Sequence, residues 1–171
     1  YAELIEALSP NKGIIADIIS QMLTRFTDDV NRTVGLVWEY DLKVLPFSNR
    51  NNLNYKFPLR LDNLSVQDIG LASKGQQDII NLAVTLNALK YLKLTNYPLF
   101  LDEVGSSFDY VHRQNFVRLI RDLSTSGYCS QIFCVNHFTA DYGGITNADT
   151  VVLNPDNVVV PDIFNKHVKI N

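Results

Sequence analysis

The chain has 171 residues, a length that suits one domain with a substantial core. Hydrophobic residues make up 46% and charged residues 19%, as in an ordinary globular protein, and no apolar run approaches the roughly 18 residues of a membrane helix. The formal net charge of −3 excludes a global basic field, so any contact with nucleic acid must be local or supplied by other parts.

Residues 1–35 are expected to form a leading segment and a helix. Ser9-Pro10 is a helix-start or turn signal. Apolar side chains then recur at steps of three and four residues, at Ile15, Ile18, Ile19, Met22, Leu23, Phe26 and Val30. The pattern favours an amphipathic helix on the core, because it is shorter than the roughly three heptads that a coiled coil needs. A coiled-coil stem leading into the domain stays open as the alternative.

Residues 36–62 read as two strands, 36–44 and 55–61, joined by a polar loop at 46–54. Their aromatic side chains fit sheet packing better than a stacking surface for bases: Trp38, Tyr40, Phe47, Tyr55 and Phe57. The one modest basic cluster of the chain lies in the same region and is a candidate contact for a phosphate backbone: Lys43, Arg50, Lys56 and Arg60.

A second helix is expected to begin after Ser73 and to run to Leu94. Ser73 and Gln76 fit the Ser-x-x-Gln pattern of a helix N-terminus. Apolar residues follow at helical spacing, at Ile79, Ile80, Ala83, Val84, Leu86, Leu89 and Leu92. A first turn with serine, glycine and backbone N–H groups is a ready site for an anion.

A short buried strand, 99–101, ends in two adjacent carboxylates, Asp102 and Glu103. Such a pair suits a magnesium–nucleotide site, where one carboxylate holds the metal shell and the other polarises the attacking water. Farther on, Asp109 can cap a third helix, which carries one apolar face formed by Phe116, Leu119, Ile120 and Leu123.

The C-terminal third is expected to add strands. Ser126-Gly127 ends the third helix, and a buried apolar strand, 131–135, leads to Asn136-His137. A loop at 141–147 precedes two short Val-rich strands, 150–153 and 157–160, and His167 is expected at the surface of a basic tail. The alternation of helix and buried strand from residue 71 onward predicts an α/β fold with a mostly parallel sheet flanked by helices.

The two cysteines, Cys129 and Cys134, are separated by an odd offset in the expected strand. Side chains alternate along a strand, so these two point to opposite faces and cannot pair with each other. We expect reduced core thiols in a cytoplasmic protein. Two thiols and three scattered histidines also lack the spacing of a zinc site.

The order of these motifs resembles the ABC-type ATPases. Their signature motif is matched by Ala72-Ser73-Lys74-Gly75-Gln76, with Lys74 in place of the usual glycine. Their Walker B strand is matched by 99–102 with Glu103 after it, and their D-loop by Ser106-Ser107-Phe108-Asp109. His137 stands where this family has its switch histidine.

The branch of this family is suggested by two further features. The long gap between Gln76 and Asp102, and valine rather than proline after Glu103, are more similar to SMC-type than to transporter ATPases. The leading helix and the sheet before the signature resemble the branch that repairs DNA double-strand breaks. No Walker A run is present, and the chain begins at Tyr1, so we expect a piece of a longer polypeptide.

The resemblance implies the C-terminal lobe (36–171) of an ABC-type, P-loop NTPase head, entered by a helix (1–35) from a coiled coil. Its cofactors would be ATP and Mg²⁺, with Asp102 on the metal and Glu103 and His137 catalytic. The nucleotide contacts would come from Ser73, Lys74, Gly75, Gln76, Ser107 and Asp109.

The implied partners are the Walker A lobe, a second copy of the head, DNA and a metal-dependent nuclease. The resemblance does not imply an association with a membrane. This piece by itself would be an inactive part of the ATPase. Two alternatives stay open: a subunit of a transporter-type ATPase, and a nucleotide-binding scaffold that does not hydrolyse ATP. The intact Asp102–Glu103 pair counts against the scaffold.

Overall fold

The computed structural model forms two compact units, unit 1 (Tyr1–Leu94) and unit 2 (Thr95–Asn171). It describes residues 1–9, 13–46, 57–62, 64–66, 68–137, 148–153 and 167–170. Within these ranges no helix combines the length and the apolar character that crossing a bilayer requires.

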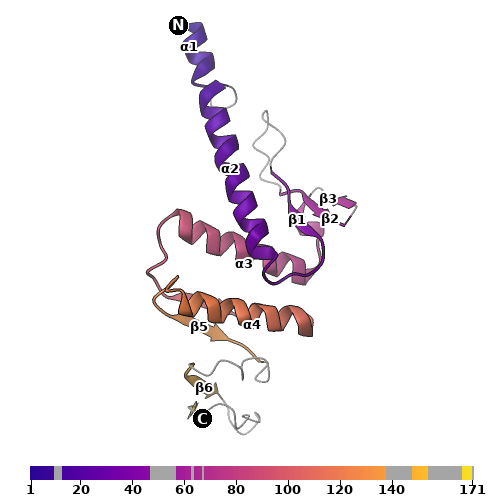
Figure 1. The fold of residues 1–171 in the computed structure, drawn as a ribbon, viewed down its shortest axis with the longest axis vertical. Coiled ribbons are helices and arrows are strands. Elements are labelled where there is room, and N and C mark those ends of the chain that lie inside the picture. The colour runs from indigo at the N-terminus through magenta and orange to yellow at the C-terminus, as the bar shows by residue number, and fades with distance from the viewer. Residues whose placement is uncertain are drawn as a thin grey trace. The chain divides into compact units, whose positions relative to one another are not determined.

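Unit 1 contains the helices α1 (Ala2–Ala7), α2 (Gly13–Val34) and α3 (Lys74–Tyr91) (Figure 1). Only the C-terminal part of α2 is packed on the core, through Thr27, Val30 and Val34. The N-terminal part instead exposes its large apolar side chains, at Ile14, Ile15, Ile18, Ile19 and Met22. The predicted helix on the core is therefore right for one half of α2 and wrong for the other.

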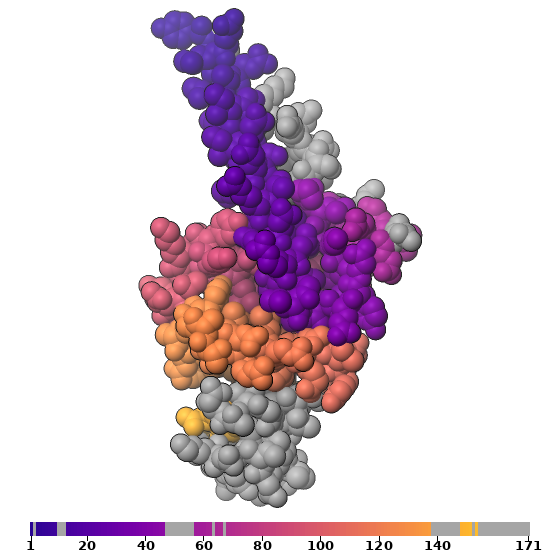
Figure 2. Space-filling model, in the orientation of Figure 1, coloured from indigo at the N-terminus to yellow at the C-terminus, as the bar shows by residue number. Residues whose placement is uncertain are grey.

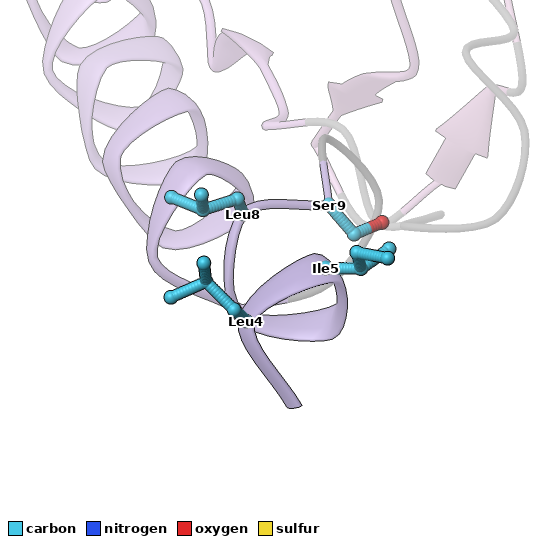
Figure 3. Close-up of a pocket in the computed structure, with 4 residues that line it drawn as sticks. All are labelled: Leu4, Ile5, Leu8 and Ser9. Atoms are coloured by element: carbon cyan, nitrogen blue, oxygen red, sulfur yellow. The ribbon is translucent and has the colours of Figure 1, made fainter. Parts of the chain in front are cut away.

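We call residues 1–9 and 13–22 the stem. Figure 2 shows this indigo end of the chain projecting from the body of unit 1. The apolar surface of the stem includes Leu4, Ile5 and Leu8, in and just after α1, which are exposed and, with Ser9, line an open hollow of about 380 Å³ (Figure 3). The exposure of so many apolar side chains favours the coiled-coil alternative for the stem.

Unit 1 also holds a small antiparallel sheet in the order β1 (Leu42–Val44), β2 (Leu59–Leu61) and β3 (Leu64–Val66). Leu42 pairs with Leu61, and Leu59 pairs with Val66. One face of the sheet is buried, through Leu42, Val44 and Leu59. The strand β3 was not predicted, because its three residues are too few to show an alternating pattern.

The predicted strand 36–44 is wrong over residues 36–41 and right only over β1. The amide of Gly35 donates to the Asn31 carbonyl, and the amide of Trp38 donates to that of Val34, so the chain leaves α2 in a turn. Val37 is fully buried in that turn, and this burial outweighs the strand preference of the neighbouring aromatic and branched residues. Residues 47–56, with most of the predicted loop, Arg50 and Lys56, lie outside the described residues.

Side-chain amides fix α2 to its neighbours. Asn31 donates to the Val44 carbonyl at 2.9 Å and accepts from the Val44 amide at 2.8 Å, as a paired strand residue would. Asn87 of α3 is buried and donates to the Thr33 hydroxyl at 2.9 Å and to the Ala83 carbonyl at 2.8 Å. Because buried polar groups must be paired, these bonds set the register between α2, α3 and β1.

The helix α3 ends three residues earlier than predicted. Its last residue is Tyr91, whose hydroxyl donates to Asp29 of α2 at 3.0 Å and whose ring meets Phe26 edge to face. Lys93 then takes a positive φ of 57°, and the Leu94 amide donates back to the Leu89 carbonyl. This left-handed residue stops the helix.

Unit 2 carries a parallel strand pair, β4 (Leu99–Asp102) and β5 (Ile132–Val135), connected through α4 (Tyr110–Thr125). The pairing runs from Leu99 opposite Ile132 to Asp102 opposite Val135. As predicted, α4 is capped by Asp109 and buries Phe116, Leu119 and Ile120. Another parallel pair is formed by β6 (Thr150–Leu153) and β7 (His167–Ile170). These parallel strands and the helix α4 confirm the predicted α/β class.

The strand β5 was predicted to be buried, but Phe133, Cys134 and Val135 are exposed. Both cysteines are free, as predicted, yet Cys134 is not a core thiol. Neighbouring atoms desolvate its sulfur and raise the pKa of the Cys134 thiol to about 11, although the residue as a whole is exposed. The predicted strand 157–160 and loop 141–147 lie outside the described residues.

The buried amide of Asn87 gives a first prediction. Replacing Asn87 with alanine should lower the free energy of unfolding by about 2 kcal/mol, because Thr33 and the helix lose a buried hydrogen-bond partner. Urea titration checks this, with Asn81→Ala on the exposed side of α3 as the matched control, expected within about 0.5 kcal/mol of the unmodified protein. Equal effects from the two variants would contradict a structural role for the buried amide.

Candidate functional site

The signature residues of unit 1 form the N-terminus of α3. Ser73 is the N-cap: its hydroxyl accepts from the Gln76 amide at 3.3 Å, and the Gln76 side chain accepts from the Ser73 amide at 2.9 Å. This reciprocal pair is a capping box, and it holds the first turn in one conformation. The predicted roles of Ser73 and Gln76 at the helix start are therefore confirmed as local structure.

The segment before α3 is fixed as well. A single 3-10 turn, η1 (Ile69–Leu71), is capped by Asp68, which accepts from the Gly70 amide at 3.0 Å. Gln77 reaches back and donates to the Ala72 carbonyl at 2.8 Å. Sequence reasoning did not select Gln77, since it found no task for the residue after the signature glutamine. This hydrogen bond fixes the backbone of the residue that precedes Ser73.

Lys74 lies exposed in the first turn of α3 and forms an ion pair with Asp78 at 2.8 Å. The first amides of a helix have no partner within the helix, and the helix dipole makes this end attractive to anions. The lysine adds a positive charge to that end. Asp78 offsets part of this charge, and an exposed pair of this kind is weak enough for an incoming anion to open it.

The acid pair of unit 2 lies where β4 ends. Glu103 has a left-handed φ of 50°, and its amide donates to the Val135 carbonyl at 2.9 Å, one step beyond the last paired residues of the strands. Its carboxylate lies 2.7 Å from Nε2 of His137. The structure thus brings together the two residues that were predicted to be catalytic, which the sequence separates by a whole helix.

The Glu103–His137 contact is open to solvent, since the side chains are 52% and 77% exposed. Water screens such a pair, so it contributes at most about 1 kcal/mol. A ligand that offers a better partner to either group can therefore separate them.

Asp102, the predicted metal ligand, alternates with the buried Leu99 and Leu101 and so shares the exposed face of β4 with Phe100. In the part of the chain that the structure describes, no three acidic, histidine or cysteine side chains gather into a metal cage. An exposed carboxylate alone nevertheless fits Mg²⁺, which keeps several waters and takes one or two carboxylates together with substrate phosphates.

The predicted D-loop is a tight turn between β4 and α4. The Ser106 amide donates to the Glu103 carbonyl and the Phe108 amide to the Gly105 carbonyl. Phe108 is buried, with its ring edge-on to Phe116 at 5.9 Å, while Ser106 and Ser107 remain exposed. The buried Phe108 thus anchors the loop, and the loop exposes Ser106 and Ser107 to solvent.

Asp109 ends this loop, and both oxygens of its carboxylate are engaged by His112, with a further backbone hydrogen bond from Val111. One oxygen accepts from the His112 amide at 3.0 Å, and the other lies 2.8 Å from Nδ1 of the His112 ring. The backbone hydrogen bond from His112, followed by the charge and the ring hydrogen bond of the same residue, lowers the pKa of Asp109 below its ordinary value. Sequence reasoning missed His112, whose only signal is its place three residues after an N-cap aspartate.

The predicted site residues are divided between the units: Ser73, Lys74, Gly75 and Gln76 belong to unit 1, and Asp102, Glu103, Ser107, Asp109 and His137 belong to unit 2. Within each unit the residues are neighbours on the same turn or strand edge.

No protein-family model matches the sequence, and no curated protein matches it in sequence. Solved structures match the fold. One comes from work on ATP-driven dimerisation and DNA-stimulated activation of SMC ATPases, with 14% identity, a TM-score of 0.58, and coverage of 85% of this chain and 83% of that one. A second, an Smc head bound to the C-winged helix domain of ScpA, has 12% identity, a TM-score of 0.54, and coverage of 78% and 40%.

A third is an Smc head domain with an extended coiled coil, bound to the C-terminal domain of ScpA, from Pyrococcus furiosus. It has 12% identity and a TM-score of 0.51, and the match covers 75% of this chain and 34% of that one. The chain has the fold of an SMC head lobe. It spans well under half the length of the two Smc heads that are bound to ScpA.

Gly105 allows a test of the loop geometry. A Cβ at this position, where φ is +86°, would lie 3.0 Å from Phe108 and 3.3 Å from Phe116. Gly105→Ala should therefore cost about 2 to 4 kcal/mol of unfolding free energy, from strain and from overpacking together. Gly127 has a similar φ of +67° but open space around it, so Gly127→Ala should cost only about 1 kcal/mol. Chemical denaturation of both variants measures the two losses of unfolding free energy. Equal losses would show that Phe108 and Phe116 do not crowd Gly105.

The capped carboxylate of Asp109 predicts a pH dependence. A carboxyl group whose pKa is lower in the folded state stabilises the protein above its ordinary pKa of about 3.9, and this contribution is lost as the pH falls through the folded value. The stability difference between the unmodified protein and Asp109→Asn should therefore shrink as the pH is lowered from about 6 to below 4. Urea unfolding at several pH values measures it; a difference that stays constant would contradict the assigned hydrogen bonds.

Proposed function

We propose that this chain is the C-terminal half of an SMC-like ATPase head, which binds and hydrolyses ATP between two dimerised heads. The observation that carries this proposal is the approach of Glu103 and His137 to 2.7 Å at the end of a parallel strand pair. The carboxyl ends of parallel strands are where α/β proteins bind ligands. The shared fold and the order of the sequence motifs support the same function.

In this proposal, the two acidic residues at the end of β4 have separate tasks. Asp102 would hold Mg²⁺ through its exposed carboxylate. Bound Mg²⁺ would neutralise the negative charge of the phosphates. Glu103 orients the attacking water and accepts its proton, and His137 contacts the γ-phosphate. Without nucleotide these two side chains bind each other, and the weakness of their exposed contact lets a phosphate and a water take their places.

The signature residues act on the nucleotide of the partner head. Ser73 caps α3 and, with the first-turn amides of Lys74 and Gly75, presents hydroxyl and N–H donors toward the γ-phosphate. Gln76 keeps this turn rigid through the capping box. Lys74 adds a charge that a glycine at this position would lack, after releasing Asp78. Ser107 and Asp109 provide the contact of the D-loop across the interface.

The Walker A half of the head is the partner that completes unit 2. Phe100 and Phe133 stack on each other with ring centroids 4.8 Å apart, and both are exposed together with Val135. Parallel sheets are stable when both faces are covered. We infer that the Walker A half covers this apolar face and supplies the phosphate loop that the chain lacks.

Head closure would act on DNA through the stem. The contacts of Asn87 with Thr33 and of Tyr91 with Asp29 join the signature helix α3 to α2. A movement of α3 that follows ATP binding would therefore also move the stem, which we infer continues as a coiled coil. The finer assignment, to repair and recombination of DNA together with a metal-dependent nuclease, rests on the sequence resemblance.

Steady-state ATP turnover of the complete polypeptide tests the function. Glu103→Gln should lower turnover by roughly 100-fold or more, because the general base is lost, and should accumulate an ATP-bound dimer. Ser73→Arg should prevent that dimer, because the arginine fills the space of the γ-phosphate at the start of α3. Sedimentation with and without ATP measures the dimer.

Two substitutions at exposed positions of unit 1 are the matched controls: Ser65→Arg on β3 and Glu3→Gln on α1. Both should turn over ATP as the unmodified polypeptide does. If the unmodified polypeptide has no turnover, or if turnover is indifferent to Glu103→Gln and Ser73→Arg, the non-hydrolysing scaffold replaces the proposed function.

A further inference from the structure

His112 is a buried polar residue to which the function above gives no task. Only 1% of its surface is exposed, and it is one of the largest fully buried side chains of the described residues. Its amide and its ring hold the two oxygens of the same carboxylate, that of Asp109, at 3.0 and 2.8 Å. The backbone amide of Val111 also donates to this carboxylate, so the His112 ring is the side chain that holds the second oxygen and with it the plane of the carboxylate.

The side-chain caps of α3 and α4 make a useful comparison. In α3 the third residue of the helix, Gln76, returns its side chain to the backbone amide of the cap, and the Ser73 hydroxyl needs no further partner. In α4 the third residue, His112, returns its ring to the side chain of the cap instead. Capping the helix requires one oxygen of Asp109. The second contact does not serve the cap: it pairs the buried ring of His112 and, at the same time, fixes the second oxygen of Asp109.

Burial differs sharply across this contact. The His112 side chain is 2% exposed, whereas that of Asp109 is 55% exposed and follows the exposed Ser106 and Ser107. An exposed aspartate ordinarily samples several rotamers, and ordering it on binding has an entropic cost. A hydrogen bond from a buried, immobile ring removes that freedom before any partner arrives. The lowered pKa of Asp109 keeps its carboxylate ionised in this position.

We propose that His112 is a positioning residue, whose ring holds the Asp109 carboxylate in the orientation that meets the second head. This inference rests on the proposed function, since it assumes that the loop from Gly105 to Asp109 lies at the interface of an ATP-bound dimer. His112 itself touches neither nucleotide nor partner. Its effect is on the affinity between the heads, because a preordered loop loses less entropy when they close.

The test measures the dissociation constant of the ATP-bound dimer in the complete polypeptide carrying Glu103→Gln. Adding His112→Leu, which fills the buried position with an apolar side chain, should raise this constant about ten-fold, as expected for a lost hydrogen bond to a charged group. His112→Asn places an N–H donor where Nδ1 stands, so its dissociation constant should return to within about three-fold of the parent value.

A change at Asp109 tests the same contact from the exposed side, and the unfolding free energy of the variant is measured beside the dissociation constant. Asp109→Ser keeps a good N-cap but removes the oxygen that the ring holds. It should weaken the dimer at least as much as His112→Leu does, because the carboxylate itself is lost, and adding His112→Leu to it should weaken the dimer no further. Leu119→Ala is the control, because it removes a buried side chain from the same helix away from the loop. It should lower the unfolding free energy and leave the dissociation constant unchanged.

Three results would overturn the inference: no change with His112→Leu, no rescue by His112→Asn, or an equal weakening by Leu119→Ala, which would make the role of His112 structural only. If Glu103→Gln alone forms no ATP-bound dimer, the proposed function fails and this inference fails with it. A stable dimer that is indifferent to His112 overturns the inference alone.

Discussion

The register of one parallel strand pair determines where the chemistry of unit 2 lies. Because Asp102 is paired with Val135, the residues that follow the two strands leave the sheet at the same edge. The amide of Glu103 continues the ladder by one bond, to the Val135 carbonyl, and this bond brings its carboxylate to His137. A shift of the register by one residue would turn every side chain of one strand to the opposite face and would separate the pair. The site therefore depends on strand pairing before it depends on any side chain.

Two helix starts give the remaining site residues their fixed positions. Ser73 and Asp109 are ordinary N-caps, and each would stabilise its helix in a protein of any function. The same geometry gives the first-turn donors of α3 the fixed position that the proposed anion contact needs, and it holds the carboxylate of Asp109, which ends the proposed D-loop. Structural and functional interpretations of these residues are thus not alternatives. A cap is a rigid place for a polar group, which explains why motif residues occur at such positions.

Features that depend on neighbouring residues in the sequence were predictable, whereas features that depend on packing were not. The caps at Ser73 and Asp109 and the parallel strands around α4 follow from local patterns, and the structure confirms them. The supposed strand start at Leu36 failed because burial of Val37 in a turn outweighs local propensity. His112 was missed for a related reason: a lone histidine in a helix gives no sign of burial or of a partner until the tertiary structure places it.

The exposed side chain of Glu103 argues for hydrolysis rather than for a scaffold. A residue other than glycine with a φ of 50° carries strain of about 1 to 3 kcal/mol, and glycine or asparagine would occupy the position at lower cost. The chain places an exposed glutamate there and directs its carboxylate to His137, where the contact adds little stability. Asp62 and Lys93 take the same left-handed φ where the chain turns, so the distinguishing feature is the side chain: a scaffold gains nothing from an exposed carboxylate that is only weakly held. An enzyme does, because such a carboxylate can exchange its histidine partner for a water molecule.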